Sequence, residues 1–374
     1  MKALFHVNHL WGVGHFTRIA AIANAVVAAG GEATVLSGNT PVSGRLAGAV
    51  RLVALPAIRA GDTTYSSLVT AQDWPVSEEQ WTRRAAIIAG TLEACAPDIL
   101  ITETFPFGRR KLAREILPLI EAAQAGGAKI VASLRDVPTP PAGARRLEEC
   151  ADRLRTHYDA VLIHGDPAIT PLNDIWPGEI PVPAYLTGYV ATAAAPQPER
   201  RGVVVSAGGG GDAAPLLRAA LSAWQGGLLA DQPWTFITGQ HAPEGLHEAL
   251  IAAAPRHFGA EILHTAPDLP ARIARAQLSI SRGGYNTVAE TIAAGTPALV
   301  IPFASDGEPE QDIRARRFAA MGLLTRLPEA DLTPGSLAAA ARAALESPAP
   351  PPDAIRLDGA EASARRLAEI AGNG

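Results

Sequence analysis

Two polar side chains follow a pair of glycines near the amino terminus, in the stretch "LWGVGHFTRI" over residues 10–19. Apolar residues then recur at spacings of three and four, which predicts a helix over 16–29. His15 and Arg18 would therefore lie in the first turn of this helix, where backbone N–H groups attract anions. Because histidine has an ordinary pKa of about 6.5, His15 is a candidate general base. The alternative is a tight turn whose histidine has only local partners.

A second glycine-rich turn follows the strand-like run "VVVSAGGGGD" over residues 203–212. Glycine lets a ligand approach the backbone closely and leaves N–H groups to face a phosphate. The turn lacks the Gly-Lys-Ser/Thr ending of a triphosphate-binding loop, which argues against ATP hydrolysis. Its alternative is a loop without function. The candidate donor-binding residues of the two glycine turns are Gly14, Ser206, Gly208, Gly209 and Gly210.

The most informative stretch is "SISRGGYNTVAE", residues 279–290, in which a strand, a glycine pair and a helix follow one another. A helix that starts near Asn286 or Thr287 would place Glu290 in its first turn, where a carboxylate could accept both hydroxyls of a ribose. Thr287 and Glu290 also have the spacing of a capping box, which needs no ligand. The residues alone favour neither interpretation.

Further polar residues follow the other apolar runs. Glu310 and Gln311 stand near the start of a basic helix, where they could contact sugar hydroxyls or simply favour the positive helix end. Glu103 and Asp136 each follow a strand and are weaker catalytic candidates. The basic residues Arg18, Arg109 and Arg135 are candidates for the acceptor side. The basic group around Arg109 could also meet a lipid surface, although a solvated helix face is favoured.

Strand-like apolar runs alternate with helical patterns twice along the chain, which predicts parallel sheets covered on both faces. In the first half the expected strands are 2–7, 32–37, 98–102, 129–134 and 160–165. In the second half they are 202–211, 234–239, 261–266, 278–284, 297–303 and 322–327. The predicted fold class is α/β, with two doubly wound, Rossmann-like domains facing across a cleft. Ligands of such sheets bind beyond the carboxyl ends of the strands.

Proline- and alanine-rich sequence separates the two halves, and it sets the expected domain boundaries. We expect an acceptor-side domain over 1–185, a linker over 186–200 and a nucleotide-sugar-binding domain over 201–355. A tail helix over 356–374 would cross back to the first domain.

Composition excludes several classes of protein. Of the 374 residues, 48% are hydrophobic and 18% are charged, so a large core can form. The net charge of −5 shows no excess of basic residues of the kind that binds nucleic acid. The two cysteines, Cys95 and Cys150, indicate a reducing compartment without disulfides, and no apolar run reaches the length of a membrane span. We therefore expect a cytoplasmic protein without a metal centre.

Together, "GVGH" (12–15), the glycine turn at 208–211 and "SRGGYNTVAE" (281–290) followed by "EPEQ" (308–311) resemble the GT-B glycosyltransferases. They are most similar to the family that adds N-acetylglucosamine to the lipid-linked peptidoglycan precursor, and to bacterial predicted glycosyltransferases. In that family the third block binds the uridine nucleotide. The resemblance implies that Glu290 holds the ribose and that Gln311, with Glu310, meets the donor sugar. It implies diphosphate contacts from Arg282, Gly283, Gly284, Asn286 and Thr287.

The activity implied is an inverting, metal-independent transfer from a nucleotide-diphosphate sugar, with a UDP-sugar as co-substrate and no other cofactor. The acceptor is an unidentified small molecule, glycan or lipid-linked compound, with peripheral contact at the inner membrane face as one expectation. The first turn has fewer glycines than the peptidoglycan family, so that acceptor is not carried over. The stretch "GVGHFTR" (12–18) also resembles nucleotide-sugar hydrolases, in which His15 would act with water. A UDP-sugar 2-epimerase and a nucleotide-sugar sensor are further alternatives.

Overall fold

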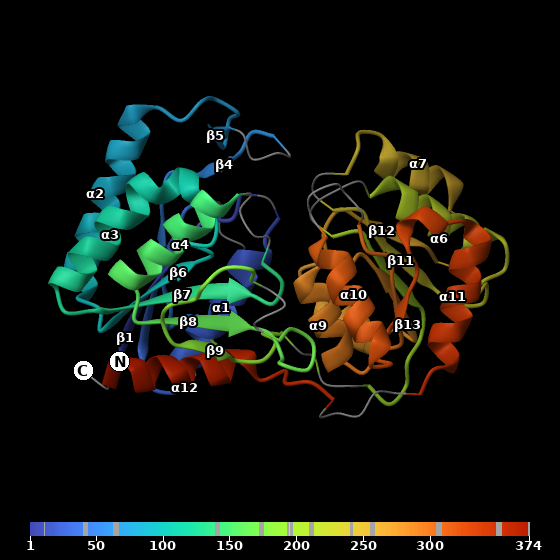
Figure 1. The fold of residues 1–374 in the computed structure, drawn as a ribbon. Helices are drawn as coiled ribbons and strands as arrows, with labels where there is room; N and C mark the ends of the chain where they lie inside the picture. The colour runs from blue at the N-terminus through green and yellow to red at the C-terminus, as the bar shows by residue number, and fades with distance from the viewer. Residues whose placement is uncertain are drawn as a thin grey trace. The chain divides into compact units, whose positions relative to one another are not determined.

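A computed structural model of the chain describes residues 1–10, 12–39, 44–62, 67–138, 143–171, 176–192, 194, 197–208, 213–239, 242–254, 259–303, 309–348 and 354–372. The chain folds into two compact units, each with its own parallel sheet (Figure 1). The first unit comprises Met1–Val190 and Arg356–Gly374, and the second comprises Ala191–Ile355. Within the described residues, no helix combines the length and the apolar character needed to cross a bilayer.

The first unit is built on a seven-stranded parallel sheet with the order β3-β2-β1-β6-β7-β8-β9. Its strands are β1 (Lys2–Val7), β2 (Glu32–Ser37), β3 (Arg51–Ala54), β6 (Ile99–Glu103), β7 (Lys129–Arg135), β8 (Ala160–His164) and β9 (Ala184–Leu186). A separate antiparallel pair consists of β4 (Ile58–Ala60) and β5 (Leu68–Thr70). Four strands, β3, β4, β5 and β9, were not predicted from the sequence, because each has only three or four residues and forms no long apolar run. Three of them, β3, β5 and β9, are also partly exposed, whereas β4 is mostly buried.

Helices cover both faces of this sheet (Figure 1). They are α1 (Gly14–Ala28), α2 (Glu78–Cys95), the 3-10 turn η1 (Arg110–Leu112), α3 (Ala113–Ala125), α4 (Ala144–His157) and α12 (Gly359–Gly372). Successive strand residues point to opposite faces, so Leu100 packs in the core beneath α2, α3 and α4 while Ile101 packs in the core beneath α1 and α12. Burial on both sides explains why these strands are continuous apolar runs.

The second unit has a six-stranded parallel sheet with the order β12-β11-β10-β13-β14-β15. Its strands are β10 (Val203–Ser206), β11 (Trp234–Ile237), β12 (Glu261–Leu263), β13 (Leu278–Ser281), β14 (Ala298–Val300) and β15 (Thr325–Arg326). Its helices are α6 (Ala214–Gln225), α7 (Leu246–Ala253), α8 (Leu269–Arg275), α9 (Tyr285–Ala293), α10 (Glu310–Ala320), the 3-10 turn η2 (Glu329–Asp331) and α11 (Pro334–Glu346). On one face, α6, α7 and α11 cover a core in which Trp224 stacks on Trp234 at 5.5 Å.

The start of α9 corrects one expectation from the sequence. The helix begins at Tyr285 after the N-cap residue Gly284, earlier than Asn286 or Thr287. Thr287 is therefore inside the first turn and is not an N-cap, so Thr287 and Glu290 do not form a capping box. Glu290 lies in the second turn rather than the first, and its side chain is buried.

A buried ion pair ties the helices of the first unit to β1. The guanidinium of Arg84, on α2, donates from Nε and Nη2 to the carboxylate of Glu115, on α3, at 2.5 and 2.8 Å. His6 of β1 lies 2.9 Å from the same carboxylate, and Asn8 accepts from Arg84 at 3.2 Å. Burial alone would raise the pKa of the Glu115 carboxyl, but the hydrogen bonds from Arg84 and His6 outweigh it and lower this pKa to about 2.

We predict that Arg84→Met destabilises the first unit by about 3–5 kcal/mol, because it leaves the Glu115 carboxylate buried without its cation. Arg83→Met on the exposed side of α2 is the matched control and should change the free energy of unfolding by less than about 0.5 kcal/mol. Urea unfolding of the two variants measures the difference. Equal midpoints for both variants would contradict this role of the ion pair.

Candidate active site

Polar side chains gather at the carboxyl ends of four neighbouring strands in the first unit. Glu103 ends β6, Ser133 lies near the end of β7, His164 ends β8 and Thr187 follows β9. Glu103 and Ser133 are register partners, and the two-residue alternation of β8 places His164 on the same face. This is the face covered by α1 and α12, since Ile101, two residues before Glu103, belongs to that core.

The first turn of α1 brings His15 to this row. His15 Nδ1 lies 2.8 Å from Glu103 Oε1, and the guanidinium of Arg18, one turn along α1, pairs with the same oxygen. Ser133 donates its hydroxyl to the other carboxylate oxygen, Oε2. The Glu103 side chain is 1% exposed and Arg18 is 2% exposed, whereas the His15 side chain is 15% exposed. The histidine is therefore the member of the cluster that reaches the surface.

Glu103 is held in its ionised form. Burial alone would raise the pKa of its carboxyl, but the charge of Arg18 and the hydrogen bonds from His15 and Ser133 hold this pKa well below its usual range. Nδ1 of His15 lies 3.2 Å from Arg18 Nη2 and 3.3 Å from Thr104 Oγ1, but its shortest contact is the one to Glu103 at 2.8 Å. An ionised carboxylate only accepts hydrogen bonds, so this shortest contact places the proton of the imidazole on Nδ1. The second ring nitrogen, Nε2, then carries a lone pair, and no described residue hydrogen-bonds to it.

His15 is neutral in the folded protein. Burial and then the charge of Arg109 lower its pKa to about 3, although the hydrogen bond to Glu103 acts in the opposite direction. A neutral imidazole with Nδ1 occupied and Nε2 open can accept a proton from a hydroxyl group, and the Glu103 carboxylate would stabilise the imidazolium that forms. The geometry is that of a general base, whereas a pKa of about 3 makes His15 a weak base in this structure, since proton transfer at neutral pH is best served by a pKa of about 7.

The other residues singled out in the first half have different surroundings. Gly14 is the first residue of α1, Arg135 ends β7 and Arg109 precedes η1 with a φ of 58°. Asp136 is fully buried, and its carboxylate accepts from the Tyr189 hydroxyl at 2.9 Å and from the Val137 backbone N–H at 2.8 Å. These bonds favour a structural role for Asp136 over proton transfer.

In the second unit, the predicted donor residues lie at the carboxyl ends of β10 and β13. Ser206 ends β10, and the backbone N–H of Arg282 donates to its carbonyl at 3.2 Å. Gly283 needs to be a glycine, because a Cβ there would lie 2.9 Å from the carbonyl oxygen of Gln311 on α10. A Cβ on Gly284 would meet no atom of the described residues within 4 Å. Among the described residues no side chain caps the α9 N-terminus, and backbone N–H groups at such a helix end attract anions.

Two arginines lie beside this turn. Arg314 of α10 donates to the Gly283 carbonyl at 2.6 Å, and its guanidinium stands over the Tyr285 ring. Arg282 pairs with Glu329 at 2.7 Å and is 4% exposed. Gln311 accepts from the Phe303 backbone N–H through its side-chain oxygen at 3.1 Å. This bond fixes the Gln311 amide and leaves its NH₂ group for other contacts.

The remaining donor candidates lie in the same region or outside the described residues. Asn286 and Thr287 are half-buried in the first turn of α9, and Glu310 is buried in the first turn of α10. Gly208 has a φ of 76° and lies against Gly239, where a Cβ would come within 2.3 Å of the Gly208 carbonyl oxygen. Gly209 and Gly210 lie outside the described residues.

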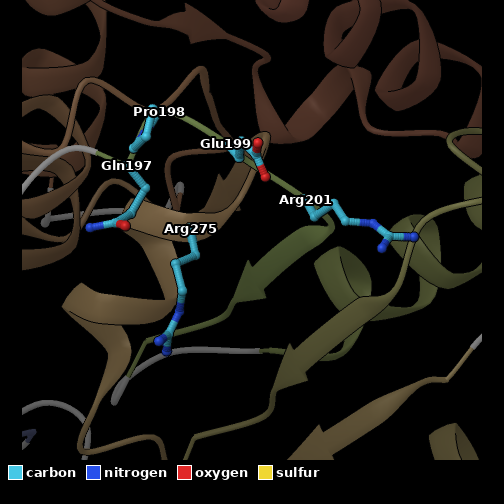
Figure 2. A pocket seen from close by; sticks show the side chains of 5 residues that line it. All are labelled: Gln197, Pro198, Glu199, Arg201 and Arg275. Carbon is cyan, nitrogen blue, oxygen red and sulfur yellow. The ribbon is translucent and has the colours of Figure 1, made fainter.

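A cavity of about 640 Å³ lies elsewhere in the second unit, lined by Gln197, Pro198, Glu199, Arg201 and Arg275. Arg201 precedes β10 and Arg275 ends the helix before β13, so the cavity is at the amino ends of these strands. Its charged side chains are exposed, and those of Arg201 and Arg275 point in different directions (Figure 2). This is the edge opposite the predicted donor residues, and it is not assigned to the candidate site.

Comparison with known proteins gives matches in sequence to part of the chain. Residues 209–366 match the glycosyltransferase family 28 C-terminal domain. A UDP-N-acetylglucosamine–N-acetylmuramyl-(pentapeptide) pyrophosphoryl-undecaprenol N-acetylglucosamine transferase of Rhodospirillum centenum is 39% identical over 136 residues, 36% of each chain. A transferase of the same name from Methylobacterium radiotolerans is 38% identical over 106 residues, 28% of this chain and 29% of its own. The matches thus span about a third of these relatives' lengths.

Solved structures match the chain along its whole length. MurG of Acinetobacter baumannii has a TM-score of 0.56 and 15% identity, and the match covers 100% of this chain and 99% of that one. The glycosyltransferase VinC in complex with dTDP has a TM-score of 0.62 and 16% identity, with 100% of both chains covered. The chain has the GT-B fold. It is similar to the peptidoglycan N-acetylglucosaminyltransferase family, as its sequence motifs predict.

One residue of this polar cluster was not predicted from the sequence. His164 was included in the expected strand 160–165, but no role was predicted for it. Its signal was a histidine at the end of an otherwise apolar strand, where the strands of a parallel sheet present their functional residues. The pairing of His15 with Glu103 could not be predicted either, because 88 residues separate them and only the strand order brings them together.

Three histidines of the first unit, the buried His9 and His164 and the partly exposed His15, predict a loss of stability in mild acid. Burial, with a smaller contribution from nearby arginines, lowers the pKa of His9 to about 4 and those of His15 and His164 to about 3. In the unfolded chain they titrate near about 6.5. Between pH 6.5 and 5 the unfolded chain therefore binds more protons than the folded chain, and the free energy of unfolding falls as the pH falls.

Thermal unfolding at several pH values between 7.5 and 5 measures this dependence. His9→Phe should reduce it, because the edge-on packing of this ring against Phe16 can be kept without a titrating group. His157→Asn, at the end of α4, is the control and should retain the dependence of the wild type. A melting temperature that is constant over this pH range would contradict the lowered pKa values.

Proposed function

We propose that the chain is a glycosyltransferase that moves a sugar from a nucleotide-diphosphate donor, with UDP as the nucleotide, to an acceptor hydroxyl with inversion at the anomeric carbon. The single observation that carries the proposal is the His15–Glu103 pair in a chain of GT-B fold. The likeness of the second unit to the family 28 C-terminal domain supports a nucleotide-sugar donor. The names of the curated relatives favour UDP, whereas VinC was solved with dTDP, so both nucleotides belong in the tests.

In the proposed reaction, His15 Nε2 removes the proton of the acceptor hydroxyl while its oxygen bonds to the anomeric carbon. The bond from that carbon to the donor phosphate breaks on the opposite face, and the diphosphate leaves with the electron pair. One displacement of this kind inverts the configuration. Glu103 accepts from the imidazolium at Nδ1 and stabilises its charge, while Arg18 keeps Glu103 ionised.

The second unit is assigned to the donor. Backbone N–H groups at the start of α9, which no described side chain caps, would bind the diphosphate beside Gly284. They would also stabilise the charge that develops on the leaving group, so the proposal requires no metal ion. Glu290 is proposed to hold the ribose, and Gln311 the donor sugar through its NH₂ group.

A nucleotide-sugar hydrolase would use the same pair to activate water, and a 2-epimerase would release no sugar. Incubation with UDP- and dTDP-sugars, with and without a panel of sugar, glycan and polyprenyl-diphosphate acceptors in ¹⁸O-labelled water, separates these reactions. We expect acceptor-dependent release of the nucleotide diphosphate and a glycoside product. Sugar carrying ¹⁸O without acceptor would identify a hydrolase, an isomerised donor an epimerase, and binding without turnover a sensor.

His15→Ala should lower kcat by about 10²–10⁴-fold, the usual contribution of a positioned base. His15→Asn keeps a hydrogen bond but cannot accept the proton, so it should be almost as slow. The donor affinity should change little in either variant, because it is assigned to the other unit. Steady-state kinetics with calorimetric donor titration checks this, and a near-normal kcat with a raised donor KM would make His15 a binding residue.

Glu290→Ala should weaken UDP binding by about 1–3 kcal/mol, the effect of removing hydrogen bonds to a charged group. The exposed Glu346→Ala, at the end of α11, is the control and should bind UDP like the wild type. Isothermal calorimetry of the folded variants measures the affinities. Unchanged affinity together with a lower melting temperature would show that Glu290 has only a structural role.

A further inference from the structure

A continuous line of hydrogen bonds runs behind the His15–Glu103 pair. His164 Nε2 lies 2.9 Å from Ser133 Oγ, and His164 Nδ1 lies 2.9 Å from Thr187 Oγ1. Together with the bonds of Glu103, this line joins the carboxyl ends of β6, β7, β8 and β9 to the first turn of α1. Ser133 and His164 are both at least 99% buried, so the line is shielded from water.

The donor and the acceptor of each hydrogen bond in this line follow from the charge on Glu103. The carboxylate only accepts, so the Ser133 hydroxyl must donate to Oε2. The Ser133 oxygen then accepts from His164, which must carry its proton on Nε2. His164 is neutral, because burial and the charge of Arg18 lower its pKa to about 3. Its Nδ1 therefore accepts from the Thr187 hydroxyl.

The tail helix α12 contacts the line of hydrogen bonds at His164. Ser363 of α12 lies 3.4 Å from His164 Nδ1, and its hydroxyl donates to the Gly359 carbonyl at 2.5 Å. The shorter bond at 2.9 Å makes Thr187 the donor to His164, and Ser363 occupies the remaining side of the ring. His164 therefore has one tautomer that satisfies its neighbours. A buried network in which every group is satisfied fixes the orientation of its members.

We infer that Ser133 and His164 are positioning residues, which hold Glu103 so that His15 keeps its proton on Nδ1 and presents a lone pair at Nε2. The expected effect on the rate rests on the proposed function, whereas the expected effect on the His15 tautomer does not. Both act through Glu103 and neither reaches the surface, so they do not contact the substrates. Of these two residues, Ser133 is the one whose polar group can be removed with the smaller change in side-chain volume.

Ser133→Ala removes the bond to Oε2 and leaves Oε1 with His15 and Arg18. The His15 imidazole should then populate the Nε2–H tautomer as well, because the carboxylate is less firmly oriented. Loss of the hydrogen-bond partner behind a metal-bound histidine lowers activity by about 10- to 100-fold, and we take the same range for Ser133. We expect that loss in kcat with an unchanged donor KM. Ser133→Thr keeps the hydroxyl and should restore most of the activity.

The deciding measurement is the ¹⁵N spectrum of histidine-labelled protein, with the His15 signal assigned by its absence from His15→Asn. The wild type and Ser133→Thr should show His15 protonated on Nδ1, and Ser133→Ala should show a mixture of tautomers. Ser279→Ala, a buried serine of β13 in the second unit, is the control and should leave the His15 signal unchanged.

The outcomes separate this inference from the proposed function. An unchanged His15 tautomer in Ser133→Ala would overturn the inference, whatever the activity. A changed tautomer with an unchanged rate of sugar transfer would support the line of hydrogen bonds but contradict His15 as the base. If Ser133→Ala fails to fold, His164→Leu provides a second variant, because it removes the donor to Ser133 and with it the group that orients the Ser133 hydroxyl. It should show a mixture of His15 tautomers, and a His15 that stays protonated on Nδ1 alone would overturn the inference.

Discussion

The buried, ionised carboxylate of Glu103 is the interaction on which the site of the first unit depends. A carboxylate in this environment would be protonated without compensation, because burial penalises its charge. Arg18, His15 and Ser133 supply that compensation from three directions. Removal of the charge would release all three partners, since the tautomer of His15 and the orientation of Ser133 both follow from it.

The fold leaves the residues of this arrangement little conformational freedom. Glu103 and Ser133 are neighbours in a parallel ladder, and His15 and Arg18 are one turn apart on a helix that packs on the same face. The strand residues that pack against α1 and α12 are apolar up to the polar residues of the site. Packing of this core therefore also fixes the positions of the polar groups. Residues held by such regular elements are positioned more exactly than residues on loops.

Much of the fold could be predicted from the sequence, because strands buried on both faces are continuous apolar runs. The runs at 2–7 and 32–37 match β1 and β2, and the second half repeats the pattern. Short half-exposed strands such as β3 and β9 have no such signal. The site was less predictable, because His15 and Glu103 could be named separately but their pairing depends on strand order. The start of α9 was also wrong, because Gly284 occupies the N-cap position without a side-chain cap.

The most direct test of the account is the rate of sugar transfer by His15→Ala, Glu103→Gln and the variant that carries both changes. If Glu103 acts through His15, the two groups work as one unit and their effects do not add. The account predicts that the double variant is no slower than His15→Ala alone, with all three variants binding UDP like the wild type. A double variant slowed by the product of the two separate effects would contradict it.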